Sequence, residues 1–259
     1  MTSGKQARRQ RQAAARPPVR STEGRRASPK VLLAVLAGLA GIAVAVALVV
    51  AFAGGGGSSS AATTGSTLPD ADVIAQQFEG MPQKRDVLGK AGAPVTLVEY
   101  IDLQCPICRQ FETDVMPTII DRYVRTGKLR VEARPIAFIG PDSERGRSGM
   151  IAAGAQNRAF NFAQLLYFNQ GPENGGWLSD SMVADAAASI PGLDTTKFSD
   201  DLSTVDDRAA SYDRQAQADA VSGTPTLLVG KTGAKLTSLG AGAPSVAALS
   251  AEIERALNS

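Results

Sequence analysis

Two cysteines three positions apart are the residues of this 259-residue chain best suited to chemistry. The segment Cys105-Pro106-Ile107-Cys108 places the two thiols one helical turn apart if a helix begins there, close enough to form a disulfide. Pro106 suits the first turn of such a helix, where its missing N–H costs nothing. A thiolate at Cys105 is favoured by the unpaired N–H groups and the dipole of a helix N-terminus. The pattern therefore indicates a redox-active dithiol.

The two thiols are expected to differ in role. Cys105, at the helix terminus, is expected to be the more exposed thiol and is the candidate nucleophile. Cys108, one turn further on, is the candidate resolving thiol that closes the disulfide. Thiol–disulfide exchange passes through a mixed disulfide, so it needs one reactive thiolate and one partner of this kind.

A cysteine pair can also bind a metal or form a structural disulfide. A zinc site needs about four ligands, whereas the chain has two cysteines and no histidine. We therefore expect no metal, and nothing in the sequence implies an organic cofactor. A purely structural disulfide remains an alternative, but a bond that closes so short a loop constrains the unfolded chain little.

The elements around the dithiol follow an α/β pattern. Residues 95–101 are β-branched and aromatic and predict a buried strand, while residues 129–137 alternate and predict a second, parallel strand. A helix after Cys108 is predicted from apolar residues four positions apart, and Pro117 should kink or interrupt it. The residues of its apolar face are Phe111, Val115, Ile119 and Tyr123.

The second half of the chain predicts helices first and strands later. Apolar clusters within residues 141–203 indicate successive helices, with Ser179 as an N-cap. The aromatic side chains there either form the core of this helical segment or line a lip that binds unfolded substrate. Residues 225–229 and 235–239 predict a hairpin, and a last helix follows Pro244.

These motifs together resemble a known superfamily. The strand, the Cys-Pro-x-Cys, the interrupted helix and a late Gly223-Thr224-Pro225-Thr226 are similar to the thioredoxin fold, specifically to DsbA-like thiol:disulfide oxidoreductases. The resemblance covers roughly residues 85–259, and the helical insertion at about 141–203 favours the DsbA-like branch over thioredoxin itself. It implies a domain of α/β class at residues 70–259.

The resemblance also implies roles for residues outside the dithiol. Pro225 is expected to follow a cis peptide bond and to face the thiols, and Thr224 to offer backbone groups to a bound substrate. Glu99 matches a buried acidic position that aids proton transfer from Cys108; the alternative is a carboxylate at the strand edge in solvent. The best-studied oxidases carry histidine at the position of Ile107, so the resemblance predicts a weaker oxidant here.

The N-terminal third predicts a membrane anchor. Residues 1–30 hold nine of the 27 Lys and Arg residues and only one of the 25 acidic residues, Glu23, so the remainder has a net charge of −6. Residues 31–53 are uninterrupted and apolar, and as a helix they reach roughly 34 Å, enough to span a bilayer. This charge bias predicts a cytoplasmic arm at 1–30 and export of the C-terminal domain. Cleavage after Ala51-Phe52-Ala53 is the alternative, although the run is longer than a signal-peptide core.

A flexible linker and an extracytoplasmic location follow from this order. Residues 54–69 are rich in Gly, Ser, Thr and Ala, which predicts a random coil. Outside the cytoplasm disulfides form and need catalysts. The acidic balance of the exported part gives no indication of nucleic-acid binding.

Three functions remain open from the sequence. The first is a single-pass membrane enzyme that forms disulfides in exported cysteine-containing proteins and is recycled by a membrane redox partner. The second is a reductase or isomerase fed with electrons through the membrane. The third is a chaperone-like binding module whose dithiol is incidental. The presence of both thiols and of Thr224-Pro225 favours an enzyme.

Overall fold

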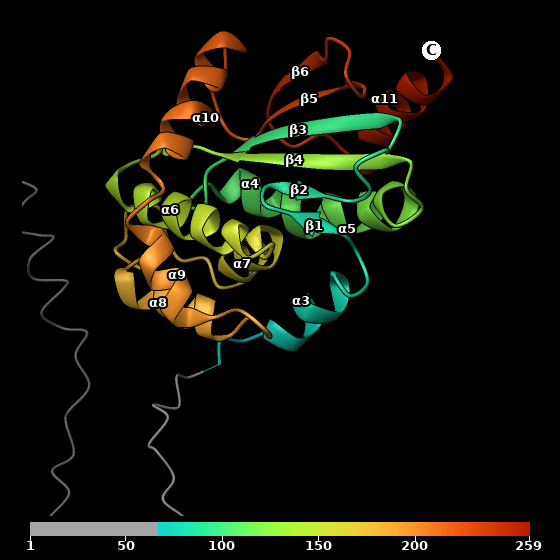
Figure 1. Ribbon diagram of the computed structural model, residues 1–259. Coiled ribbons are helices and arrows are strands. Elements are labelled where there is room, and N and C mark those ends of the chain that lie inside the picture. Colours follow the sequence, from blue (N-terminus) through green and yellow to red (C-terminus); the bar gives the residue numbers. More distant parts are fainter. Residues whose placement is uncertain (1–66) are drawn as a thin grey trace, which may run out of the picture. The chain divides into compact units, whose positions relative to one another are not determined.

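The computed structural model describes residues 67–259, which form an α/β domain around one mixed sheet (Figure 1). The sheet has six strands in the order β1-β2-β4-β3-β5-β6, and only β3 and β4 run parallel. The strands are β1 (Gln83–Lys84), β2 (Val87–Leu88), β3 (Val95–Ile101), β4 (Leu129–Pro135), β5 (Thr226–Lys231) and β6 (Thr237–Ala241). Every residue of β3 is buried, as its apolar run predicts.

The two faces of β3 belong to different clusters of buried side chains. Leu97 and Ile101 point into the larger core, whereas Val98 and Tyr100 point to the opposite face, against Tyr212 of α10 (Asp206–Ala218). Because side chains alternate along a strand, Glu99 shares the face of Leu97 and Ile101. That face is covered by the helical segment after the dithiol and by α11 (Val246–Asn258).

The segment after the dithiol is helical but irregular. It runs through α4 (Pro106–Gln110), a π-helical turn at Phe111–Val115, α5 (Met116–Ile119) and a second π-helical turn at Ile120–Val124. The predicted interruption at Pro117 is confirmed: Pro117 has no N–H to donate to the carbonyl four residues earlier, and the wider π-helical turn lies directly before α5.

The helical insertion is confirmed and contains four helices. They are α6 (Pro141–Ala155), α7 (Ala159–Phe168), α8 (Asp180–Ala188) and α9 (Thr195–Leu202), and Figure 1 shows them as one group to one side of the sheet. Ser179 caps α8 as predicted, accepting a hydrogen bond from the Met182 N–H at 3.2 Å. Phe160, Phe162 and Tyr167 are buried, which confirms the core interpretation for these three aromatic side chains.

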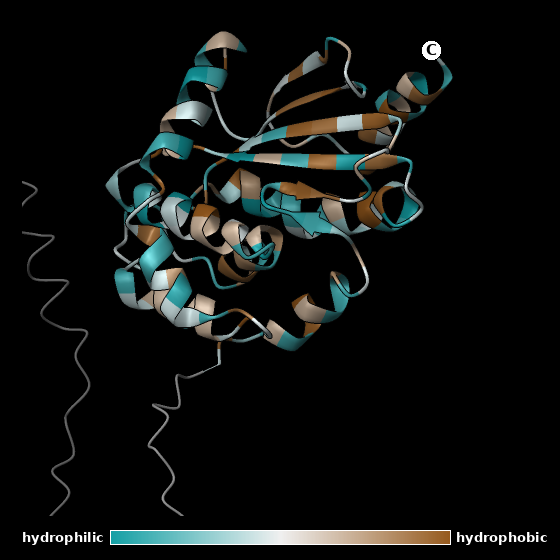
Figure 2. Cartoon of the chain, in the orientation of Figure 1, coloured by the Kyte–Doolittle hydropathy of each residue, from teal (hydrophilic) through white to brown (hydrophobic). Residues whose placement is uncertain are grey.

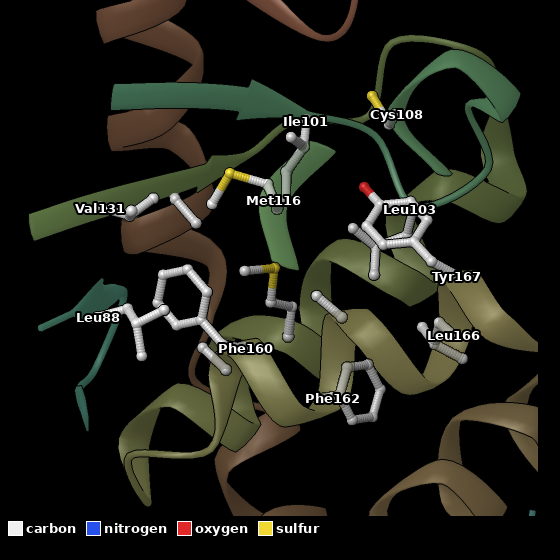
Figure 3. Packing of buried hydrophobic residues seen from close by; sticks show 14 of the residues in the cluster. Leu88, Ile101, Leu103, Cys108, Met116, Val131, Phe160, Phe162, Leu166 and Tyr167 are labelled. Atoms are coloured by element: carbon white, nitrogen blue, oxygen red, sulfur yellow. The ribbon is translucent and has the colours of Figure 1, made fainter. Parts of the chain in front are cut away.

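The core joins the insertion to the sheet. Figure 3 shows Phe160, Phe162 and Leu166 of α7 in the same cluster as Leu88 of β2 and Val131 of β4. Hydropathy follows the same division, since much of the apolar colour lies on the central strands and the exposed helix faces are largely polar (Figure 2).

Two elements of the described region were not predicted. The β1–β2 hairpin has strands of two residues each, too short for an alternation signal. Helix α9 has only two apolar residues, Phe198 and Leu202, which is too short a repeat to predict a helix. Helix α3 (Ala71–Gln77) precedes the β1–β2 hairpin in the chain.

The predicted N-terminal arm and anchor, and all but the end of the predicted linker, lie outside the described residues. That end is bound to the domain: the Leu68 N–H donates to Ser189 Oγ at 2.8 Å, and Pro69 O accepts from Asn169 Nδ2 at 3.2 Å. The domain therefore begins by residue 68. Among residues 67–259, no helix has the length and hydropathy that crossing a membrane requires.

Candidate active site

The dithiol lies at the N-terminus of α4, as the sequence predicts. Cys105 is the N-cap residue, in an extended conformation, and its Sγ accepts a hydrogen bond from the Cys108 N–H at 3.4 Å. Pro106 is the first residue of the helix. Both thiols are free; Cys108 is fully buried and Cys105 is 5% exposed, so Cys105 is the more accessible of two largely buried sulfurs.

A loop far along the chain meets the first thiol. The Thr224–Pro225 peptide bond is cis, which confirms the expectation from the resemblance. Cys105 Sγ donates to the Thr224 carbonyl oxygen at 3.3 Å, across 119 residues of sequence. Pro225 is buried immediately before β5, and Thr224 is half-buried beside it.

The surroundings of the two thiols shift their pKa values in opposite directions. Hydrogen bonding from the Cys108 thiol, helped by Thr224 and by the backbone N–H groups at the helix terminus, lowers the pKa of Cys105 to about 6, although its burial acts in the opposite direction. Burial raises the pKa of Cys108 well above the usual range, and its contact with Cys105 adds to this. Cys105 is thus the thiol that ionises first, and Cys108 keeps its proton.

Glu99 is buried, which excludes the alternative of a solvent-exposed carboxylate at the strand edge. It is 1% exposed, and burial raises its pKa to about 7. A second buried carboxyl group, Glu112, contacts it, and burial together with the charge of Glu99 raises the pKa of Glu112 well above its usual range. Sequence reasoning missed Glu112, although its position four residues after Cys108 places it on the same helix face as the resolving thiol.

The loop between β3 and the dithiol is held by Asp102, which sequence reasoning also missed. Its Oδ1 accepts from the Gln104 N–H and from Ser143 Oγ, both at 2.8 Å. Its Oδ2 accepts from the N–H groups of Phe138 and Ile139 at 2.8 and 2.9 Å. One buried carboxylate therefore ties the dithiol loop to the loop after β4 and to α6.

The insertion reaches the dithiol through the loop after α7. Gln170 Nε2 donates to the carbonyl oxygens of Leu103 and Cys105 at 3.0 and 3.2 Å. The Asn174 N–H donates to Gln104 Oε1 at 2.8 Å. These bonds fix the backbone immediately before and at the nucleophile. They could not be read from the sequence, because they join a polar loop to residues about 70 positions away.

Two exposed apolar side chains lie on the segments that these contacts hold together. Ile107, between the two cysteines, is 43% exposed, and Phe138, whose N–H is bound by Asp102, is 52% exposed. Pro106 is exposed as well. Within residues 67–259 no three His, Cys, Asp or Glu side chains gather in a way that could hold a metal ion.

Comparison with known proteins agrees with this geometry. A family model described as thioredoxin matches residues 83–251. The chain belongs to the thioredoxin family. A probable disulfide bond formation protein D of Bacillus cereus is 30% identical over 147 residues, which cover 55% of this chain and 68% of that protein. The disulfide bond formation protein D of Bacillus subtilis is 26% identical over 170 residues, covering 61% and 72%.

Solved structures show the same fold. BdbD from Bacillus subtilis, in its oxidised form, superposes with a TM-score of 0.60 at 22% identity, covering 69% of this chain and 98% of that one. The alpha-DsbA1 of Wolbachia pipientis gives a TM-score of 0.58 at 19% identity, covering 67% and 90%. With the sequence relatives, these establish the protein as a DsbA-like thiol–disulfide oxidoreductase of the thioredoxin superfamily.

Proposed function

We propose that this oxidoreductase forms disulfides in exported proteins, with Cys105 as the nucleophile and Cys108 as the resolving thiol. The observation that carries the proposal is the lowered pKa of Cys105, about 6, beside a Cys108 that stays protonated. Stabilising the thiolate stabilises the reduced dithiol, and this makes the disulfide the stronger oxidant. Electrons then flow from a substrate dithiol to the enzyme.

The reaction transfers two electrons in two exchange steps. A substrate thiolate attacks Cys105 Sγ in the disulfide, which forms a mixed disulfide and releases Cys108 as a thiolate. Cys108 takes up a proton, for which Glu99 is the proposed donor because it is buried on the β3 face toward the helix of Cys108. A second substrate thiolate then attacks the substrate sulfur of the mixed disulfide and expels the Cys105 thiolate. The substrate is oxidised and the enzyme dithiol is reduced.

Thr224 and Pro225 are the proposed substrate-binding residues. The Thr224 carbonyl oxygen lies 3.3 Å from the nucleophilic sulfur, so a peptide joined to Cys105 must pass beside it. The exposed side chains of Ile107 and Phe138 offer apolar contacts to such a peptide without demanding a particular sequence. Cysteine-containing proteins that are not yet folded fit this surface.

The proposal also includes the place of the enzyme in the cell. The charge-free run at residues 31–53 follows nine Lys and Arg residues and is followed by a linker, residues 54–69, that contains none. This charge bias supports a single-pass anchor with the catalytic domain outside the cytoplasm. There a membrane redox partner, as a disulfide or quinone oxidant, reoxidises the dithiol. Tethering keeps the enzyme close to that partner.

One residue supports the opposite direction of electron flow, from the enzyme to its substrate. Ile107 contributes neither a charge nor a side-chain hydrogen bond to the Cys105 thiolate, which favours a less oxidising disulfide. A reductase or isomerase supplied with electrons through the membrane would use the same dithiol in the reduced state.

Trapping of mixed disulfides tests the proposed roles. Cys108→Ser should accumulate covalent complexes with exported proteins. Cys105 still attacks a disulfide of such a protein, but the thiol that would release the mixed disulfide is lost. Cys105→Ser should accumulate none. The complexes are detected as bands that disappear on reduction in non-reducing electrophoresis. Equal trapping by the two variants, or by neither, would reject the assignment.

A further inference from the structure

Two buried carboxyl oxygens near the dithiol have no hydrogen-bond partner among the described residues. They are Glu99 Oε2 and Glu112 Oε1, and neither residue forms an ion pair there. Leaving a buried oxygen unpaired costs roughly 1–3 kcal/mol. Two such oxygens on side chains in mutual contact point to a common explanation.

The positions of the two residues bring these oxygens together. Glu99 points from the central strand β3 into the core under the helical segment, and Glu112 lies one turn beyond Cys108 on that segment. Each carboxyl group affects the pKa of the other, so the two groups lie within reach of a hydrogen bond if one of them is protonated. Two ionised carboxylates cannot form such a bond, because each is an acceptor only.

We propose that Glu112 Oε1 carries a proton that it donates to Glu99 Oε2, so that Glu99 alone exchanges a proton with Cys108. One proton then satisfies both unpaired oxygens. Glu112 is a positioning residue, which acts on the thiol through Glu99. The proposal rests on the function proposed above and extends it to a residue that the exchange steps do not use.

Gln164 of α7 determines which oxygen of Glu112 holds the proton. Its Nε2 donates to Glu112 Oε2 at 2.7 Å and to the Glu112 backbone carbonyl oxygen at 3.3 Å. Two acceptors on one side fix the amide with its nitrogen toward Glu112. Oε2 is therefore the accepting oxygen, and the proton lies on Oε1, the oxygen without another partner.

The surrounding charges favour the same arrangement. The titratable groups gathered here are Cys108 on the helix, Tyr167 on α7 and Asp102 after β3, and none of them is basic. In Figure 3 the Tyr167 side chain lies in the same part of the core as Cys108. Burial raises the pKa of both glutamates, and the bond from Glu112 opposes this effect at Glu99. Above about pH 7 the pair therefore holds a single negative charge, on Glu99, and below that pH both carboxyl groups are protonated.

The Glu99–Glu112 pair acts when the dithiol is reoxidised. The Cys105 thiolate attacks a disulfide oxidant and forms a mixed disulfide with release of one thiolate. The Cys108 thiol gives its proton to the Glu99 carboxylate, and the Cys108 thiolate attacks Cys105 Sγ. The Cys105–Cys108 disulfide forms, the second thiolate of the oxidant leaves, and two electrons have passed from the dithiol to the oxidant. Glu112 keeps its own proton throughout.

The pH dependence of disulfide closure tests the proposal. Reduced full-length protein is mixed with saturating oxidised glutathione, and the rate that no longer depends on glutathione concentration is measured between pH 5 and 9. In the wild type this rate should rise with a midpoint near 7, where Glu99 ionises. Glu112→Gln should keep that midpoint, because the amide donates to Glu99 as the protonated acid does. Glu112→Leu should raise it by about one to two pH units, since the ionised Glu99 loses a hydrogen bond.

The opposite shift would overturn the proposal. If Glu112 were ionised, both variants would remove a negative charge beside Glu99 and lower the midpoint. An unchanged midpoint in Glu112→Leu would overturn it equally. If instead the wild type forms no disulfide with glutathione, the proposed function itself fails.

An infrared measurement gives a second readout that needs no folded leucine variant. The wild type at pH 8 should show the carbonyl band of one protonated carboxyl group, and Glu112→Gln should lack it. A wild-type spectrum without this band would contradict a protonated Glu112.

Discussion

Cys105 and Cys108 carry the same thiol, yet their surroundings give them opposite properties. Cys105 receives hydrogen bonds at a helix terminus, and Cys108 is enclosed by apolar side chains one turn further on. Sequence spacing predicted this pair and its order of exposure, because a Cys-Pro-x-Cys at the start of a helix leaves few geometries. Glu112 was missed since a lone glutamate on a helix is usually exposed, and only the three-dimensional contact with Glu99 distinguishes it.

Ile107→His tests how the dipeptide between the cysteines sets the oxidising strength. A histidine there can donate a hydrogen bond and a positive charge to the Cys105 thiolate, which isoleucine cannot. Each unit of pKa depression at Cys105 corresponds to roughly 30 mV of reduction potential. We expect the variant's potential to be higher by tens of millivolts when both proteins are equilibrated with glutathione buffers. An equal or lower potential would show that residue 107 does not control the dithiol.

Glu99→Gln should change how stability depends on pH. The pKa of Glu99 is raised from 4.5 to about 7, so between these values the folded protein holds a proton that the unfolded chain has lost. Wild-type stability therefore falls as pH rises through this window, by roughly 2–3 kcal/mol relative to Glu99→Gln. Urea unfolding of the oxidised forms at pH 4.5 and pH 8 measures the difference.

The control for that experiment is Glu79→Gln, which changes an exposed glutamate. It should leave the difference between the two pH values as in the wild type. A Glu99→Gln protein with the same pH dependence as the wild type would mean that the Glu99 carboxyl group is not desolvated.

Among the helices and strands, those with a strong apolar repeat in the sequence were the ones predicted. Strand β3 was predicted with its observed bounds, and β4 was predicted two residues too long at its end. Helix α9 and the β1–β2 hairpin were missed for want of such a repeat. The contacts of Gln170 and Asn174 with the dithiol loop were equally hidden, because they depend on how the insertion folds back.

Close packing between α6 and α7 can be tested at Gly149. A Cβ at this position would lie 2.4 Å from Phe162 Cζ. The Phe162 ring is fully buried. Gly149→Ala should therefore destabilise the domain by about 1–3 kcal/mol, despite the better helix propensity of alanine. The midpoint of urea unfolding measures this loss.

Gly154→Ala is the matched control in the same helix. Its Cβ would meet nothing closer than 3.4 Å, so the substitution should be neutral or stabilising by up to about 1 kcal/mol. Equal stability of the two variants would contradict the packing of α6 on Phe162.

At the scale of the whole molecule, the insertion and the sheet share one core and one site. Asp102 and Gln170 join the dithiol loop to elements from three parts of the chain, which makes the site a property of the complete domain. Sequence reasoning reached the superfamily and the insertion because the motifs are far apart yet specific. The proposed anchor rests on the sequence alone.

Protease added to spheroplasts tests that anchor. If residues 31–53 span the membrane with the arm inside, the protease should remove the domain and leave a short membrane-bound fragment. A soluble product that begins near Gly54 would instead show that the segment is cleaved. A protected, intact chain would place the domain in the cytoplasm.

The redox state of the dithiol in living cells tests the central proposal most directly. Cells are quenched with acid, free thiols are alkylated with a reagent that adds mass, and the protein is resolved by electrophoresis. A disulfide oxidase should be found with Cys105 and Cys108 joined, and so without added mass. A protein found predominantly with two alkylated thiols would contradict oxidation of exported proteins and identify a reductase or isomerase.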